Sequence, residues 1–342
     1  MVAQSDSKEK PFKQEELDQL LAPIALYPDS LLAQIFMAST YPLEVVQAGR
    51  WTKENQNLKG EALTAALEKQ DWDPSVKSLV NFPQVLVMMN EKLDWTQKLG
   101  DTFLAHQKEV MDTVQKLRAK AEAQGNLKTT DQQKVVVEKE TQTIIIESAN
   151  PQVVYVPTYN PTVVYGTWWY PTYPPYYYYP PGYAAGAAFI SFGVGVAIGA
   201  AWGYAWGGCH WGHHEVNIDI NRNTNINNNI DRSKYQNKVT TGQGGRGEWK
   251  HDPEHRKGVS YKDQATAQKF DRGASKNVQS REAFRGRAEA GRQDIARVDS
   301  DQFRDRSGSG SRGSKYRPDA GSMERGAAQQ GKASGGIDRA GG

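Results

Sequence analysis

The fold of the first half of the chain depends on the stretch Leu20-Leu21-Ala22-Pro23-Ile24-Ala25-Leu26-Tyr27-Pro28-Asp29-Ser30-Leu31-Leu32. Apolar residues at positions 17, 20, 21 and 24 fall on one face of a helix, which predicts a helix over residues 14–26. Pro28 breaks that helix, and Asp29 or Ser30 is placed to cap a second helix over residues 31–38. The stretch therefore predicts a helical domain whose core is built from leucine and isoleucine.

Helical periodicity continues beyond this stretch. Pro42 is suited to the first turn of a third helix, and shorter helices are expected near residues 61–69 and 75–90. A long charged helix is expected over residues 94–123, and its apolar positions are Leu99, Phe103, Leu104, Val110, Val114 and Leu117. Because that apolar stripe is thin, the helix is expected to project from the domain or to pair with a partner.

Short β-branched runs follow the helices, at Val135-Val136-Val137, Ile144-Ile145-Ile146 and Val153-Val154-Tyr155-Val156. Runs of this kind, separated by polar residues and an Asn-Pro pair, predict a small antiparallel β element. A short repeat places Pro-x-Val-Val-Tyr at residues 151–155 and again at 161–165. The repeat predicts two similar extended segments joined by a turn.

Charge divides the chain into three parts. Residues 1–147 contain 17 basic residues (Lys and Arg) and 22 acidic residues (Asp and Glu). Residues 148–214 contain neither kind, and residues 215–342 contain 25 basic and 17 acidic residues. The net charges are therefore −5, zero and +8, which indicates three different environments. Hydrophobic residues make up 38% of the chain and become sparse beyond Ile230, so one compact domain is expected, in the first half.

Several motifs carry a family resemblance. They are the opening stretch, Ala38-Ser39-Thr40-Tyr41-Pro42-Leu43-Glu44-Val45-Val46, Val-Tyr-Val-Pro-x-Tyr-x-Pro at residues 154–161, and Trp-Lys-His-Asp-Pro-Glu-His-Arg-Lys-Gly-Val at residues 249–259. Together they resemble a family of exported proteins of Gram-negative bacteria that is catalogued as a domain of unknown function. The resemblance implies export to the cell envelope, in the periplasm or at the outer membrane. It implies no activity, ligand or catalytic residue.

The start of the chain differs from what export requires. Residues 1–10 have no apolar region of the kind a signal peptide needs. Val2-Ala3-Gln4 is similar to the context around a signal-peptidase cleavage site, so a leader peptide is expected to be missing from this sequence.

The uncharged centre contains the segment most suited to association. Residues 183–208 form a Gly/Ala-rich apolar run, which as a helix would extend about 39 Å. Gly195, Gly199, Gly203 and Gly207 recur every fourth residue and would form one smooth helix face, with Trp202 and Trp206 among the large residues on other faces. This glycine-zipper-like pattern predicts membrane association or self-association. A flexible linker, or a helical hairpin against the soluble domain, is the alternative.

The Pro/Tyr/Trp-rich residues 166–182 precede that run. Tyrosine and tryptophan are typical of a membrane interface, where the ring is buried and the polar tip stays in water. A proline-rich segment that docks in a partner's groove, or an unspecific linker, would have the same composition.

A cluster of possible metal ligands follows the apolar run, at Cys209, His210, His213 and His214. Thiolate and imidazole suit Zn²⁺ or another transition metal. No second Cys/His pair has standard spacing, so an interfacial His/Trp cluster is the competing interpretation.

The expected order along the chain is a disordered N-terminus (residues 1–12), a helical domain (13–125) and a small β element packed on that domain (130–165). An aromatic segment (166–182), an apolar segment (183–208) and a tail (209–342) follow. The predicted fold class is a mainly α N-terminal domain with a small antiparallel β element, a Gly/Ala-rich apolar helix and a long disordered C-terminal tail. The tail is His/Asn-rich and then Arg/Gly-rich.

The predicted function is that of a cell-envelope structural or interaction protein, because no catalytic motif is found. Its expected partners are a membrane or envelope component and a second copy of the chain. Anionic lipid or lipopolysaccharide is the partner expected for the basic tail, rather than nucleic acid. The alternatives are a metal- or polyanion-binding envelope protein and, least favoured, an enzyme whose active site lies in the helical domain.

Overall fold

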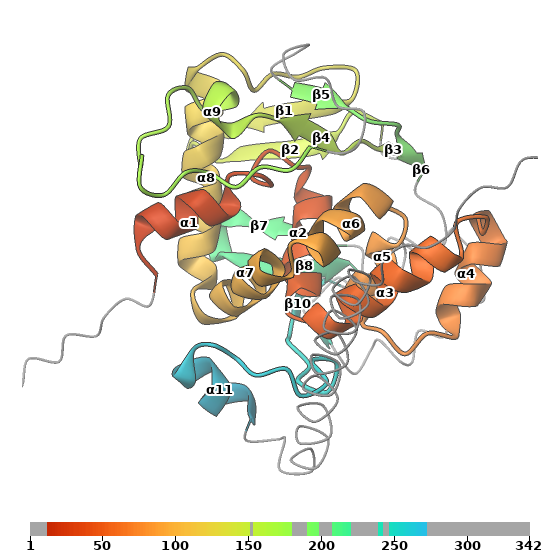
Figure 1. The fold of residues 1–342 in the computed structure, drawn as a ribbon. Helices are drawn as coiled ribbons and strands as arrows, with labels where there is room; N and C mark the ends of the chain where they lie inside the picture. Colours follow the sequence, from red (N-terminus) through yellow and green to blue (C-terminus); the bar gives the residue numbers. More distant parts are fainter. Residues whose placement is uncertain are drawn as a thin grey trace, which may run out of the picture. The chain divides into compact units, whose positions relative to one another are not determined.

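A computed structural model of the chain describes residues 12–150, 153–179, 190–197, 207–219, 239–241 and 246–271. Internal contacts divide the chain into two units, Met1–Phe284 and Arg285–Gly342, and every described residue belongs to the first. The described part is mainly helical with small antiparallel sheets, as the sequence predicts (Figure 1).

The described helices are α1 (Gln14–Leu21), α2 (Asp29–Ser39), α3 (Pro42–Glu54), α4 (Gly60–Glu68), α5 (Pro74–Leu79), α6 (Pro83–Glu91), α7 (Leu93–Ala105), α8 (Gln107–Ala123), α9 (Pro161–Val164) and α11 (Gln264–Asp271). A proline stands in the first turn of α3, α5, α6 and α9. Its fixed φ suits a helix start, and the N–H it lacks would have no partner inside the helix. The prolines thus divide the domain into short helices.

The described strands are β1 (Gln133–Val137), β2 (Ile144–Ser148), β3 (Val153–Val154), β4 (Pro157–Tyr159), β5 (Ile190–Phe192), β6 (Val196–Ala197), β7 (Gly207–His210), β8 (Glu215–Asp219), β9 (Val239–Thr241) and β10 (Arg246–Trp249). β1 and β2, from the first two predicted runs, form an antiparallel pair, whereas the third run, as β3, does not join them. β3 pairs with β6, β4 pairs with β5, and β7, β8, β10 and β9 form a four-stranded sheet in that order.

Helix α2 is the centre of the core. Ten of its eleven residues are buried, and it packs against α3, α5 and α7 and against strands β2 and β7. Helix α7 approaches α2 closely at Gly100, where an added Cβ would overlap the carbonyl group of Ser39. A helix that is apolar on nearly all sides is buried on all sides, as the hydrophobic run from Leu31 to Ala38 requires.

Helix α1 ends at Leu21, five residues before the sequence predicts, because tertiary contacts satisfy the backbone beyond it. The carbonyl oxygen of Ala22 accepts hydrogen bonds from the hydroxyls of Tyr159 and Tyr165, at 2.9 and 2.8 Å. The Leu26 N–H donates to the Tyr159 hydroxyl at 3.2 Å. Two distant tyrosines therefore replace the intrahelical bonds that a longer helix would have made.

The predicted long helix over residues 94–123 is wrong, because the chain breaks at His106 into α7 and α8. Val110, Val114 and Leu117 of α8 are almost completely buried in the same core as Leu99 of α7. A straight helix of this length would carry its second half away from that core. The apolar stripe thus packs within the chain and does not project.

A buried arginine of α8 joins the helices to the β segments, and we call this contact the Arg118 clamp. The Arg118 guanidinium donates to the carbonyl oxygens of Ala25, Tyr27 and Ile144 at 2.8, 3.0 and 2.7 Å. It also pairs with Asp29 at 2.6 Å, and the Trp211 ring lies 4.7 Å from it. The Trp211 N–H donates to the other oxygen of the Asp29 carboxylate at 2.7 Å.

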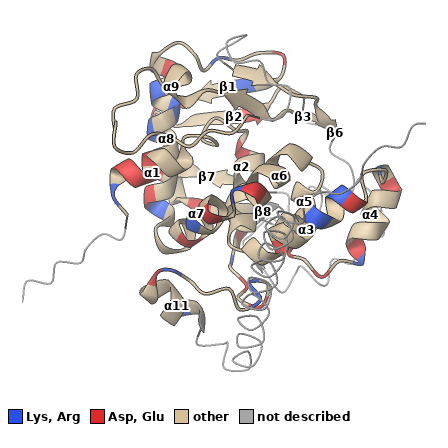
Figure 2. Ribbon diagram, viewed as in Figure 1, with Lys and Arg blue, Asp and Glu red and all other residues tan. Residues whose placement is uncertain are grey.

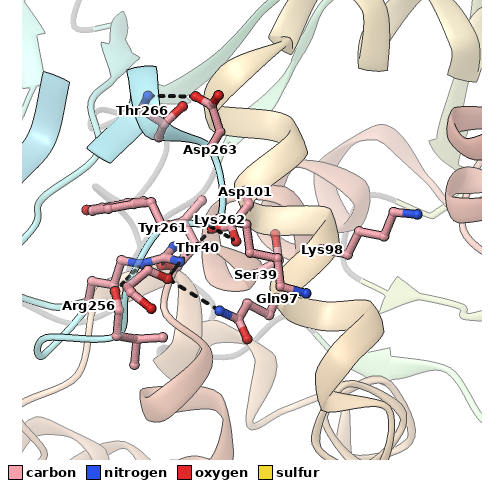
Figure 3. Close-up of polar contacts among 12 residues, drawn as sticks. Ser39, Thr40, Gln97, Lys98, Asp101, Arg256, Tyr261, Lys262, Asp263 and Thr266 are labelled. Atoms are coloured by element: carbon pink, nitrogen blue, oxygen red, sulfur yellow. Dashed lines mark hydrogen bonds and ion pairs between the residues drawn. The ribbon is translucent and has the colours of Figure 1, made fainter. Parts of the chain in front are cut away.

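A second buried arginine holds residues 249–263, which we call the strap. The Arg256 guanidinium donates to the carbonyl oxygens of Thr40, Val259 and Ser260 and pairs with Asp101 of α7. The Tyr261 ring lies 4.0 Å from its central carbon. Figure 3 shows this Arg256 clamp between α7 and the strap. In both clamps the buried guanidinium has four oxygen partners, one of them a carboxylate, which is the kind of pairing under which a buried ion is tolerated.

Two expectations about the later half are corrected. The Gly/Ala-rich run is not one helix, because its residues 190–192, 196–197 and 207–208 lie in strands β5, β6 and β7. The region from residue 209 onward is not wholly a disordered tail, because β7, β8, β9, β10, the strap and α11 belong to the folded unit. β5 pairs with β4, and β6 pairs with β3. The uncharged segment thus provides hydrogen-bond partners for the backbone N–H and C=O groups of these two short strands.

The second copy of the short repeat is also corrected. Val153–Val154 is a strand, but Pro161–Val164 is the helix α9. The Asn160 side chain accepts a hydrogen bond from the Thr162 N–H at 3.0 Å, and Gly166 leaves the helix with φ of 79°. A capping residue before the copy and a permissive glycine after it therefore favour a helical turn.

Candidate functional site

The described part of the aromatic segment, residues 166–179, packs against the helices. The Trp169 N–H donates to the Asp18 carboxylate at 2.8 Å, and the Lys120 ammonium lies 3.9 Å from the centre of the Trp169 ring. The Gln19 side chain donates to the Pro174 carbonyl oxygen at 2.6 Å, and the Gln19 carbonyl oxygen accepts from the Tyr176 N–H at 3.4 Å. These contacts thus hold the segment against α1 and α8 at Trp169, Pro174 and Tyr176.

Beside this segment lies a half-open groove of about 660 Å³, which we call the tyrosine groove. Its lining residues are Pro23, Met88, Glu91, Lys92, Leu93, Asp94, Trp95, Lys98, Pro175, Tyr176, Tyr177, Tyr178 and Lys262. One wall is the aromatic segment and the other is the corner where α6 meets α7. The volume is within the range of roughly 300–1,000 Å³ that is usual for ligand sites.

Two lining residues of the groove, Trp95 and Tyr178, pack into or against the core. Trp95 is 6% exposed, and its indole N–H donates to the Leu20 carbonyl oxygen at 2.9 Å. Tyr178 packs against the main core, and burial, with the Glu91 charge as the second cause, raises its pKa. The Tyr178 hydroxyl therefore stays protonated and is able to donate as well as accept a hydrogen bond.

The walls, in contrast, expose aromatic and apolar surface. Tyr177 is 59% exposed, Tyr176 is 42% exposed and Leu93 is 40% exposed. Glu91, Lys92 and Asp94 are also exposed, because the chain turns sharply at Lys92 between the two helices. The groove therefore offers ring faces, carboxylates and ammonium groups side by side.

The strap contributes the remaining charged residue of the rim, Lys262. The Lys262 N–H donates to Asp101 at 3.3 Å, next to the Arg256 pair, and Gln97 donates to the Ser260 carbonyl oxygen at 3.4 Å (Figure 3). Lys98, one turn before Asp101, lies 3.9 Å from Glu16 of α1. Three elements far apart in the sequence thus meet at this rim.

A second polar cluster surrounds Glu44. The Glu44 side chain is completely buried. Its carboxylate accepts from the Asp73 N–H at 2.6 Å and lies 2.9 Å from His255 and 3.2 Å from Lys257. Because Glu44 joins α3, the start of α5 and the strap, the cluster serves to hold the strap on the helices.

Comparison with known proteins places the chain in a family. Residues 13–251 match the family described as "Protein of unknown function (DUF3300)". The chain belongs to this family. A relative, the "Uncharacterized protein YacH" of Escherichia coli (strain K12), is 39% identical over 209 residues, which cover 52% of this chain. The chain spans only 33% of that relative's length. No solved structure matches.

The family match includes both walls of the tyrosine groove and Glu44, and it ends before Arg256 and Lys262 of the strap. The resemblance found in the sequence motifs is therefore confirmed as membership of a bacterial family of unknown function. The motifs at residues 20–32, 38–46 and 249–259 contribute the Arg118 clamp, the Glu44 cluster and the Arg256 clamp. The residues of these motifs are therefore distinctive because they make contacts that hold the fold together.

The structure does not bring the four proposed metal ligands together. The Cys209 thiol lies 3.7 Å from the Asp29 carbonyl oxygen, and burial raises the pKa of this thiol well above its usual range. His214 lies 2.9 Å from Asp112 of α8, whereas the His210 and His213 rings pack on each other, with centroids 4.3 Å apart. In the described part of the chain, no three His, Cys, Asp or Glu side chains are placed to hold a metal ion.

The proposed association residues are only partly described. Gly195 lies beside β3, where an added Cβ would be 2.5 Å from a Val153 side-chain carbon, and Gly207 begins β7. Gly199, Trp202, Gly203 and Trp206 lie outside the described residues. None of the described helices combines the length and hydrophobicity that crossing a membrane requires.

Sequence reasoning identified one wall of the groove and missed the other. The tyrosines were selected for their composition, whereas Glu91, Asp94 and Lys262 carried no local signal. Trp95 has the pattern of an ordinary core residue. Only the tertiary structure places these residues around one space.

Proposed function

We propose that this chain is a cell-envelope interaction protein that binds its partner non-covalently in the tyrosine groove. The observation that carries the proposal is that the exposed rings of Tyr176 and Tyr177 stand on a backbone held by the Gln19 contacts and by Pro175, which is buried. Binding to such a wall costs little conformational entropy, because the wall is already ordered.

The envelope location rests on two observations. Residues 148–214 carry no charge, and in Figure 2 charged residues gather on the helices while β3, β6 and β7 have none. The family motifs resemble those of exported proteins. An uncharged, ring-rich segment suits an envelope component, where both apolar and polar groups are present.

The groove supports binding more directly than catalysis. Its acids and bases are exposed, at the α6–α7 corner and at Lys262 of the strap, or, like Lys98, lie near a surface partner. Exposed groups of this kind contribute hydrogen bonds and orientation to a ligand. The buried groups with shifted pKa values, such as Asp29 and Asp101, are engaged in the two clamps.

The proposal is tested by sedimenting purified full-length chain with isolated cell-wall sacculi and with outer-membrane vesicles. The groove variant carries Tyr176→Ala and Tyr177→Ala. The control is Val163→Ala, which alters a residue of α9 that is 44% exposed and does not line the groove. We expect the groove variant to lose at least four-fifths of the bound fraction and the control to lose none. Equal sedimentation of all three proteins, or no sedimentation of any, would refute the proposal.

A further inference from the structure

We infer that the occupant of the tyrosine groove is a glycan, a chain of neutral sugar rings. The inference rests on the proposed binding function and adds the chemical class of the ligand. Three features of the groove lead to it: the exposed ring faces, the balance of charge along the rim, and the shape.

The ring faces come first. Tyr176 and Tyr177 leave 42% and 59% of their surface in water, although the segment that carries them is fixed. A pyranose ring has C–H groups on its face and hydroxyl groups at its edge. It can therefore cover an aromatic face while its hydroxyls keep their contacts with water and with the tyrosine hydroxyls.

The rim charges are the second feature. Glu91 and Asp94 offer carboxylates, and Lys92, Lys98 and Lys262 offer ammonium groups. A sugar hydroxyl donates one hydrogen bond and accepts others, so it can use both kinds of group. A polyanion would meet the two carboxylates on the same rim, and a cationic peptide would meet the three lysines.

The shape is the third feature. The groove is half open and holds about 660 Å³, which admits part of a polymer. A lipid tail would require a deeper apolar cavity, whereas charged residues make up five of the thirteen lining positions. A peptide that binds by adding a strand needs an unpaired strand edge, but the groove is lined by α6, α7 and residues that belong to no strand.

Isothermal titration of the full-length chain tests the inference. The probes are cellohexaose and chitohexaose as neutral glycans, polyphosphate as a polyanion, and a proline-rich decapeptide. We expect at least one hexaose to bind with an affinity that changes less than twofold between 50 and 300 mM NaCl, because no ion pair is formed. Polyphosphate and the peptide are expected to bind at least tenfold more weakly.

The variants locate the binding. Tyr176→Ala with Tyr177→Ala should weaken hexaose binding at least tenfold, and Glu91→Gln with Asp94→Asn should weaken it three- to tenfold. Tyr177→Phe, which keeps the ring and loses only the hydroxyl, should weaken binding less than the double alanine substitution, and Val163→Ala should change it less than twofold. All these side chains are exposed, and an unchanged melting temperature confirms that each variant is folded.

Two outcomes would overturn the inference. One is the absence of binding of either hexaose at millimolar concentration, and the other is hexaose binding that the tyrosine substitutions leave unchanged. If the chain sediments with sacculi or vesicles through the groove but binds polyphosphate or the peptide instead of a sugar, the glycan class is wrong while the proposed function stands.

Discussion

Substitution of Arg118 by Met tests the claim that the Arg118 clamp stabilises the fold. Arg118 is completely buried, and its guanidinium contacts three carbonyl oxygens and the Asp29 carboxylate at 2.6–3.0 Å. Methionine fills much of the same volume and suits a helix equally well, so packing and helix propensity change little. The variant thus isolates the loss of the charge and of its hydrogen bonds.

The expected loss in the free energy of unfolding is about 3–5 kcal/mol, the usual result of removing one partner from a buried ion pair. Asp29 would keep the Trp211 N–H at 2.7 Å and a weak contact with the Ile146 N–H at 3.4 Å, but no positive charge. For a folded unit of this size the loss corresponds to a fall in melting temperature of roughly 6–20 °C.

The loss should also depend on pH. Burial raises the pKa of Asp29, and the Arg118 charge and the Trp211 hydrogen bond act against that rise. Without Arg118 the pKa rises further, so the folded variant holds a proton that the unfolded chain releases above about pH 4. The variant should therefore lose stability relative to the wild type as the pH increases from 4 towards neutrality.

Urea unfolding followed by far-UV circular dichroism, at pH 4.5 and pH 7, measures these effects. Lys116→Met, an exposed cation on the same helix, is the matched control and should change the free energy by less than about 0.5 kcal/mol. Adding Asp29→Asn to Arg118→Met should recover more than about 1 kcal/mol at pH 7, because folding then no longer requires an acid to take up a proton or to be buried without its partner charge. A loss below about 1 kcal/mol for Arg118→Met would refute the reasoning.

Further substitutions test other contacts, each by the same unfolding measurement. Gly100→Ala should destabilise by about 3 kcal/mol or more, because the new Cβ overlaps the backbone of Ser39, whereas Gly212→Ala meets no atom within 4 Å and should have little effect. Burial and then the nearby arginine charge lower the pKa of His251 to about 3. Since the unfolded chain takes up this proton below about pH 6.5, stability should fall as the pH decreases from 6.5 towards 3, and less steeply in His251→Gln. Gly195→Ala should cost about 1–3 kcal/mol, because its Cβ would crowd β3; no loss would show that β6 does not pair as described.

Local signals correctly indicated where several helices start. Proline and capping residues act within three or four residues, so Pro28 and Pro42 mark the ends and starts near α2 and α3 in the sequence itself. The break at His106 has no such signal, because the residue lacks any special backbone preference. It exists because two apolar stripes must reach one core.

The late half of the chain shows the same division more strongly. Its composition indicated a disordered tail, since few apolar residues are present to offset ordering entropy. The strap is nevertheless ordered by Arg256, His255 and Trp249, which pack into a core that the first 125 residues have already formed. Composition indicates how much apolar surface a segment can bury by itself. It does not indicate which contacts a distant segment of the chain provides.

By itself the sequence determined the mainly helical class, the small antiparallel element, the uncharged centre and the family. These follow from periodicity, β-branched runs and motifs, which are properties of neighbouring residues. Only the tertiary structure decided that Tyr159 and Tyr165 end α1, that two buried arginines tie late segments to early helices, and that a groove lies between Tyr177 and the α6–α7 corner. Each of these contacts joins residues far apart in the chain, and local preference has no means of specifying such pairs.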